Sequence, residues 1–488
     1  MNIDIKKTWT NTIENKNFNR IIMIISLIVF AALSLYKVIN HVPFFDEINA
    51  WNIAQNFKPW EILEITKHEG HLFIWYYLLM PFAQHDIGYP IAMKLINWAF
   101  CFGAILLLWF KSPFNSITKV FITFSLPVQI LYIHARCYSI GIFLLFLVCL
   151  LYKNRLKHPF LYATLLILAG NTSVMALFLA FPLGLCFLYD LYDGLKRNIL
   201  SKKDLYMILS IFILGSMFIL AQFHGFTTPY YAQIKVPLTK EFYDLLISNN
   251  TVLKIILVIC HLGMFAFAWD FFEKNKHPFW VLALSSYLYM ILFCGIYRAA
   301  YWHFIFLFVN IIIALWIYLS EYNITQNFQK TYLNLFCIIF IILTLSSINY
   351  EFFYGQHIKL ALDIQTNNIM RNKKIFFFPT DSSFIGITHD IKNMGIKYYD
   401  CLGDPLNSKE FYIHQWDNPE IDFEKISLLL KKNEIAYAFV ESTRPYYNYY
   451  RKFNFSKHNY TKHHSDLEIK LIDQNKYDLI IWQIKKLK

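Results

Sequence analysis

Charged residues are scarce in this sequence. They make up 16% of its 488 residues, whereas hydrophobic residues make up 57%. Ordinary soluble domains contain about a quarter charged residues, so the composition argues against a soluble globular protein and indicates lipid as the main solvent. We therefore expect the formal net charge of +12 to reflect membrane topology and contact with anionic lipid, and not binding of nucleic acid.

Other signals are missing as well. Glycine and proline number only 15 each, which argues against several unwound helices of the kind found in inverted-repeat transporters. The sequence has neither a glycine-rich phosphate-binding loop nor a tandem repeat of the length typical of solenoids. These absences exclude the commonest nucleotide-binding and repeat architectures.

The cysteine pattern excludes two further classes of protein. There are eight cysteines, without a C-x-x-C pair or a zinc-finger spacing. Seven of them fall in or beside apolar runs, where cysteine acts as a small apolar residue, and only Cys401 lies in a polar region. We therefore expect neither a disulfide framework nor a zinc finger.

Long apolar runs are what the sequence has in abundance. A helix needs about 20 apolar residues to cross a bilayer, and the sequence predicts a polytopic α-helical membrane protein with about eleven transmembrane helices. The predicted spans are roughly 21–40, 91–110, 118–134, 137–152, 159–170, 174–190, 204–222, 252–271, 278–296, 300–320 and 331–348.

The distribution of lysine and arginine predicts the orientation. If the N-terminus is cytoplasmic, the inside loops hold more Lys and Arg than the outside ones, as the positive-inside rule requires. The first apolar run is too long for a signal-peptide core and is expected to be an uncleaved anchor. We expect a multi-pass protein of the cytoplasmic (inner) membrane, with the region after the last span outside the cytoplasm.

Two domains are predicted. Residues 1–349 form the transmembrane domain, which includes a long outer loop at about 41–90, and residues 350–488 form a soluble extracytoplasmic domain. In the second region short apolar runs at 374–379, 396–400, 436–441, 467–473 and 477–484 read as strands, and 382–394 and 420–432 have helical spacing. Alternating strands and helices indicate a small α/β domain.

Polar residues near hydrocarbon are costly and commonly mark functional sites. On the predicted topology four segments bring such residues to the outer face: FFDEINAW (44–51), EGHLFIWYYLLMP (69–81), HARCYSIG (134–141) and YRAAYWHF (297–304). Their candidate site residues are Asp46, Glu47, Trp51, Glu69, His71, Arg136, Tyr138, Arg298, Tyr301 and His303.

These residue types suit transfer of a sugar from a lipid phosphate. Arginine presents a planar fork of donors that matches phosphate oxygens, and Arg136 and Arg298 would hold the phosphate of a polyprenyl-phosphate sugar. Asp46 could act as general base on an acceptor hydroxyl, and Trp51 could stack on sugar. The alternative for each is ordinary: a solvated acidic turn, or arginines that snorkel from helix ends.

The same segments resemble the class C membrane glycosyltransferases, which include the protein O-mannosyltransferases and the lipid A aminoarabinose transferases. The resemblance covers roughly residues 20–190: an Asp-Glu pair after the first helix, the EGHLFIWYYLLMP segment, HARCYSIGIFLL and NTSVMALFLAFPLGL. The sequence departs from it at Leu72, where the family has proline, and at Asn49-Ala50-Trp51, where the aminoarabinose pattern has Arg-Tyr.

The resemblance implies an inverting transfer from a polyprenyl-phosphate donor to a cell-envelope acceptor, which could be lipid, glycan or protein. It implies that Asp46 is the catalytic carboxylate and that Glu47 assists it or orients the loop. As in some members of the family, Glu69 and His71 could bind a divalent metal ion with His303 or His224. A transporter or flippase for a lipid-linked or anionic substrate is the alternative, and it would use Arg136 and Arg298 as a substrate path.

Overall fold

The structure is a computed structural model of the chain. It describes residues 16–41, 43, 45–66, 71–85, 87–223, 266, 268–273, 275–293, 303, 305–321, 373–378, 397–399, 423–441, 461–464, 466–474 and 479–487.

The chain divides into two compact units. The first comprises Met1–His41, Thr66–Leu78 and Gly88–Tyr350, and the second comprises Val42–Ile65, Leu79–Ile87 and Glu351–Lys488. The second unit therefore includes two segments of the predicted outer loop as well as the polar C-terminal region.

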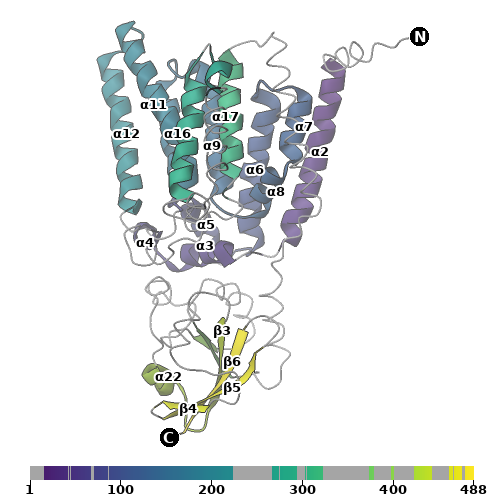
Figure 1. Cartoon of the computed structure of the whole chain (residues 1–488), viewed down its shortest axis with the longest axis vertical. Helices are drawn as coiled ribbons and strands as arrows, with labels where there is room; N and C mark the ends of the chain where they lie inside the picture. The colour runs from purple at the N-terminus through teal and green to yellow at the C-terminus, as the bar shows by residue number, and fades with distance from the viewer. Residues whose placement is uncertain are drawn as a thin grey trace, which may run out of the picture. The chain divides into compact units, whose positions relative to one another are not determined.

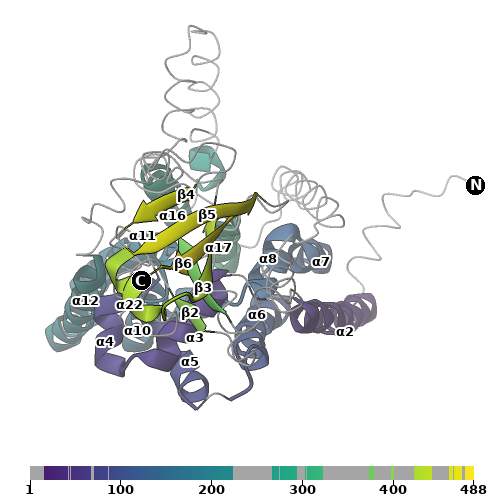
Figure 2. The ribbon, with the colours of Figure 1, turned by 90° about the horizontal axis from the view of Figure 1, so that it is seen from below.

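The first unit is built from apolar helices (Figure 1). They are α2 (Lys16–Asn40), α6 (Ile91–Lys111), α7 (Ser116–Phe124), α8 (Leu126–Ile133), α9 (Tyr138–Leu151), α10 (Pro159–Gly170), α11 (Val174–Lys196), α12 (Lys202–Phe223), α16 (His277–Ile291) and α17 (Ile305–Glu321). Both views place α2 and α12 at the margins of this bundle (Figures 1 and 2). Their exposed side chains are largely apolar, as expected for helices that face lipid.

Four helices in the described part of the chain are long and apolar enough to cross a membrane, and five if α7 and α8 form one bent span. The predicted spans that begin at 21, 91, 174 and 204 correspond to α2, α6, α11 and α12. The predicted spans at 331–348 and over most of 252–271 lie outside the described residues, so the count of about eleven stays a prediction.

One predicted span contains a bend. The span at 118–134 corresponds to α7 and α8, which meet at Ser125 with a bend of 50°. Ser125 has extended backbone dihedrals, and Pro127 lies in the first turn of α8. Proline lacks a backbone N–H, and in a continuous helix its ring would clash with the carbonyl of Thr123, four residues earlier. It is therefore favoured in the first turn of a helix and disfavoured in the interior.

A half-buried arginine connects helix ends at one end of the first unit. Arg155, which follows the short 3₁₀-helix η2 (Tyr152–Asn154), donates to Asp190 of α11 at 2.5 Å and to Glu321 of α17 at 3.0 Å. Asn275 donates to the same Glu321 carboxylate at 2.6 Å. This network links four segments that lie far apart in the sequence.

The predicted outer loop is largely helical. It contains α3 (Phe45–Asn56), α4 (Pro59–Ile65) and α5 (Ile74–Ala83). Local backbone hydrogen bonds extend to the short connection between α3 and α4. The Phe57 N–H donates to the Ile53 carbonyl, and the Glu61 N–H donates to the Lys58 carbonyl. The acidic pair thus lies within a helix and not on a connecting loop.

The C-terminal region contains a six-stranded mixed sheet of order β2-β1-β3-β6-β5-β4. The strands are β1 (Lys374–Phe378), β2 (Lys397–Tyr399), β3 (Ile435–Glu441), β4 (Thr461–His464), β5 (Leu467–Gln474) and β6 (Leu479–Lys486). The first three pair in parallel, and the rest are antiparallel. Figure 2 shows the strands side by side. The five predicted strands are confirmed, and the last two predicted strands, β5 and β6, pair antiparallel.

A short helix, α22 (Phe423–Leu429), is held against this sheet by lysines. Lys374 of β1 donates to the Leu429 carbonyl, and Lys486 of β6 donates to the Ser427 carbonyl at 2.7 Å. Both carbonyls lie in the last turn of the helix, where cations are favourable. The helix falls within the predicted 420–432, whereas the predicted helix at 382–394 lies outside the described residues.

Removal of the Arg155 side chain should destabilise the first unit. Arg155→Ala would leave the Asp190 and Glu321 side chains, 12% and 22% exposed, without their cation. We expect the free energy of unfolding in detergent to fall by about 3 kcal/mol, measured by thermal or denaturant unfolding. Arg197→Ala is the matched control: its pair with Asp193 is 69% and 39% exposed, so the change should stay within about 0.5 kcal/mol. Equal effects would contradict the network's role.

Candidate functional site

The Asp46–Glu47 pair occupies the first turn of α3. Carboxylates are stabilised there because the first turn of a helix carries partial positive charge. The Glu47 side chain is fully buried and Asp46 is half-buried. A solvated turn would leave both carboxylates in water, so this ordinary alternative does not hold for Glu47.

The remainder of α3 is also enclosed. Apolar and polar residues are buried on every side of the helix, among them Trp51, Asn49 and Asn52. The indole of Trp51 has no exposed face, so it forms part of a wall and is not an open platform for a sugar. It is unusual for a short helix to bury a carboxylate and two amides, because each buried polar group needs a hydrogen-bond partner.

The predicted arginine of the fourth span lies at a break between two helices of the first unit. The backbone N–H of Arg136 bonds to the carbonyl of His134 at 2.8 Å, which turns the chain between α8 and α9. Cys137 is the N-cap residue of α9, and its side chain makes no capping hydrogen bond. Arg136 therefore lies just before the N-terminus of α9, which carries partial positive charge, and its side chain is buried.

Four predicted site residues meet at this point. Nη2 of Arg136 contacts Nε2 of His71, and the guanidinium carbon lies 5.6 Å from the ring centre of Tyr138. The rings of His71 and Tyr138 meet edge to face at 5.5 Å. Nε2 of His303 lies 3.1 Å from the Tyr138 hydroxyl oxygen. The sequence placed these residues on one membrane face, and the structure brings them into contact.

Charge and burial fix the protonation state of His71. Arginine can only donate hydrogen bonds, so Nε2 of His71 accepts and the ring is neutral. Burial, and then the charges of Arg136 and His303, hold the pKa of His71 well below its usual range. The second ring nitrogen, Nδ1, lies 3.2 Å from the sulfur of Cys137.

The backbone of His71 is held by the turn between α10 and α11. His71 and Ser173 form an isolated antiparallel bridge, and the Leu72 N–H bonds to the Thr172 carbonyl at 3.2 Å. The hydroxyl of Ser173 accepts from the Ala176 N–H and so caps α11. The sequence Asn171-Thr172-Ser173 therefore starts a helix and anchors the loop that carries His71.

Close packing of α9 on the same turn depends on a glycine. A Cβ atom at Gly141 would lie 2.6 Å from Oγ1 of Thr172 and 2.9 Å from Cβ of Ala176. Only glycine permits this approach without a shift of one of the two helices. Gly141 lies one turn after Cys137, so it also sets where the start of α9 sits relative to the turn.

In the described part of the first unit, acidic side chains lie at one end of the helices, whereas basic side chains lie at both ends. At the end where α9 and α11 begin, the described ionisable side chains include Lys37, His41, His71, Lys94, His134, Arg136 and His303. The acidic residues in the described part of this unit are Asp190, Asp193, Asp204, Asp270, Glu273 and Glu321, all at the opposite ends of the helices. Such segregation favours an anionic ligand near Arg136.

Sequence reasoning missed Lys94 as a site residue. It lies in the first turn of α6, is buried, and donates to the carbonyls of Ile39, at 3.3 Å, and His41 at the end of α2. The His41 and His134 rings meet at 6.1 Å. A lysine that follows Pro90 at the start of an apolar helix was the available signal, but it could equally mark an ordinary helix end.

The remaining predicted residues divide into two groups. Glu69, Arg298 and Tyr301 lie outside the described residues, so their roles stay predictions. Within the residues that the structure describes, no three His, Cys, Asp or Glu side chains gather to hold a metal ion. Both ring nitrogens of His71 already face Arg136 and Cys137, so His71 as found here does not fit a metal ligand.

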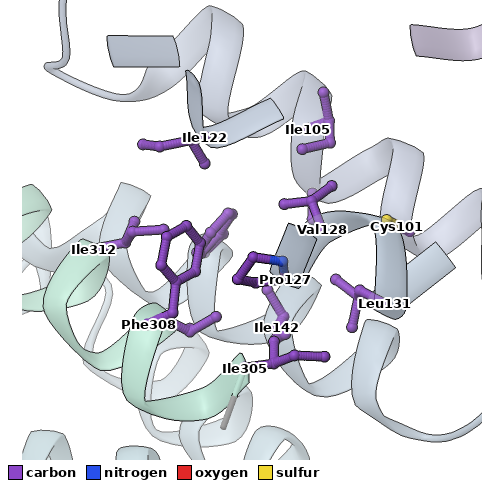
Figure 3. Close-up of a pocket in the computed structure, with 13 residues that line it drawn as sticks. Cys101, Ile105, Ile122, Pro127, Val128, Leu131, Ile142, Ile305, Phe308 and Ile312 are labelled. Carbon is purple, nitrogen blue, oxygen red and sulfur yellow. The ribbon is translucent and has the colours of Figure 1, made fainter. Parts of the chain in front are cut away.

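A cavity opens beside the bend between α7 and α8 (Figure 3). It is lined by side chains of α6, α7, α8, α9 and α17, and every labelled side chain in it is apolar or, for Cys101, a thiol. Phe308 and Ile312 of α17 face Val128 and Pro127 across it. An all-apolar lining offers no polar group for chemistry, so the cavity is not itself a catalytic site.

Gly141→Ala tests the packing that places Arg136. We expect the added Cβ to overpack the α9 contact and lower the free energy of unfolding in detergent by about 1–3 kcal/mol, despite the higher helix propensity of alanine. Gly184→Ala is the matched control, since its Cβ would meet Phe212 at an ordinary 3.7 Å and leave stability unchanged or slightly higher. Equal or higher stability of the Gly141 variant would refute the close approach.

Comparison with known proteins gives little beyond these residues. No protein-family model matches the chain, and no curated protein matches it. The chain is similar to two solved structures of ArnT from Cupriavidus metallidurans, one bound to undecaprenyl phosphate and one in the apo state. Identities are 10% and 11%, TM-scores are 0.44 and 0.43, and each comparison covers 93% of this chain and 97% of that chain. A likeness at this level does not assign an activity, which has to be argued from the residues of the chain.

Proposed function

We propose that this chain is an integral membrane glycosyltransferase. It moves a sugar from a polyprenyl-phosphate donor to a cell-envelope acceptor at the outer face of the cytoplasmic membrane, with inversion at the anomeric carbon. The proposal combines the sequence resemblance, the apolar helices of the first unit, and the contacts around Arg136. The donor and the membrane lipid are the partners it requires.

The convergence on Arg136 is the observation that carries the proposal. A buried guanidinium at the start of α9 is held by His71 and Tyr138, at the end of the helices where the described ionisable groups are basic. A lipid phosphate lies where hydrocarbon ends, and arginine and helix N-termini both favour phosphate. An arginine that only snorkelled would extend its head into water, whereas this one is enclosed.

The carboxylates of α3 supply the second half of the chemistry. In the proposed reaction the acceptor hydroxyl oxygen attacks the anomeric carbon while the bond to the phosphate oxygen breaks. Polyprenyl phosphate leaves with the bonding electrons, and the hydroxyl proton passes to Asp46. Glu47, buried one residue further along, would orient that turn, and the charge on the leaving phosphate would be stabilised by Arg136.

Other parts of the site follow from the resemblance. Arg298 would add a second cation for the phosphate, and Glu69 and Tyr301 would contact the substrate. The C-terminal α/β region would lie outside the cytoplasm, where it could meet the acceptor. No step of this mechanism uses a metal ion.

A transporter or flippase would share part of this description. Arg136 with its aromatic and histidine neighbours could equally guide an anionic lipid headgroup across the membrane. That function needs no general base, so it predicts that the acidic pair of α3 is dispensable. The acidic pair therefore separates the two functions.

Asp46→Asn should abolish sugar transfer. Loss of a general base costs about 10²–10⁴-fold in rate, and the amide of asparagine keeps the size of the side chain. Transfer is measured with the purified variant in lipid nanodiscs, a radiolabelled polyprenyl-phosphate sugar and a cell-envelope extract as acceptor.

Glu64→Gln provides the control for that experiment. Glu64 is an exposed carboxylate in α4 of the same loop, so its variant should transfer sugar at the wild-type rate. Wild-type transfer by Asp46→Asn, in a folded and membrane-inserted protein, would overturn the role of Asp46 as general base. Absence of transfer by the folded wild-type protein, together with movement of the lipid across the bilayer of a vesicle, would overturn the glycosyltransferase assignment in favour of transport.

A further inference from the structure

Both ring nitrogens of His71 face protein groups, Arg136 and Cys137. This arrangement suits a role in orienting a neighbouring side chain. Nε2 of His71 accepts from Nη2 of Arg136, as the donor-only chemistry of arginine requires. In a neutral imidazole one nitrogen carries the proton and the other a lone pair. The proton of His71 must therefore be on Nδ1.

Cys137 is the group that matches this tautomer. Its sulfur lies 3.2 Å from Nδ1 of His71, within the range in which sulfur accepts a hydrogen bond. Cys137 is the neighbour of Arg136 in the sequence and the N-cap residue of α9. The start of α9 thus supplies both the cation that needs an acceptor and the acceptor that keeps the imidazole in the correct tautomer.

The imidazole has little freedom to turn away. Its backbone is bridged to Ser173, and the next residue donates to the Thr172 carbonyl. The ring packs edge to face on Tyr138, whose ring also lies beside the guanidinium of Arg136. Side chains locked by such secondary contacts are what hold a binding group in its productive geometry.

We propose that His71, fixed in its Nδ1–H tautomer by Cys137, is a positioning residue that orients the guanidinium of Arg136 toward the phosphate of the lipid donor. This inference rests on the proposed function. It assigns to His71 and Cys137 an effect on donor affinity that passes through Arg136, and it assigns them no contact with the sugar.

A double-mutant cycle tests the inference. Binding of undecaprenyl phosphate and the KM and kcat for its sugar conjugate are measured for wild type, His71→Leu, Arg136→Ala and the double variant in nanodiscs. We expect His71→Leu to weaken lipid-phosphate binding and raise KM about tenfold or more, as loss of a hydrogen bond to a charged group does, with a smaller change in kcat. In the Arg136→Ala background the same substitution should have almost no further effect.

Conservative variants separate orientation from packing. His71→Gln offers an oxygen acceptor to Arg136 and should recover most of the affinity lost in His71→Leu. Cys137→Ser keeps an acceptor for Nδ1–H and should bind more tightly than Cys137→Ala. Each variant is first checked for wild-type thermal stability, so that a folding defect is not read as lost orientation.

The possible results test the positioning role of His71 separately from the proposed glycosyltransferase function. Additive losses in the double-mutant cycle, or equal losses for His71→Gln and His71→Leu, with intact wild-type binding and transfer, would overturn the positioning role alone. Failure of the wild-type protein to bind undecaprenyl phosphate would overturn the proposed function and the inference together.

Discussion

A guanidinium buried at the start of a helix is the constraint on which the site depends. A charge removed from water is costly unless partners hold it, and Arg136 is buried where α9 begins. Its position requires the break after α8, the loop that carries His71, and the aromatic ring of Tyr138. A protein that retains such a residue uses it either to hold helices together or to bind an anion.

Arg155 and Arg136 illustrate these two uses. Arg155 is bonded to Asp190 and Glu321 and links the ends of three helices. Its charge is neutralised by these two carboxylates, so its role is structural. Among the described residues, Arg136 contacts the imidazole of His71 and the ring of Tyr138, which orient the guanidinium. An oriented guanidinium matches the geometry of phosphate oxygens.

Much of this architecture could be predicted from patterns of hydrophobicity. The predicted span at 159–170 matches α10 residue for residue, because an apolar run between Pro159 and Gly170 has clear ends. The break at Ser125 and the strand β4, whose Thr-Lys-His-His sequence has no apolar alternation, left no comparable signal. The motif residues Arg136 and His71 were found as candidates, but their contact was not predictable: it depends on close approach at Gly141, which only the three-dimensional packing reveals.

The central claim is that a lipid phosphate binds at the start of α9. The most direct measurement is photo-crosslinking of the wild-type protein in nanodiscs with a polyprenyl phosphate that carries a diazirine next to the phosphate, followed by peptide mass spectrometry. The account predicts labelling of the peptides that contain His71 and Arg136, competed by unlabelled undecaprenyl phosphate and not by the neutral polyprenol. Labelling elsewhere, or equal competition by the neutral alcohol, would contradict it.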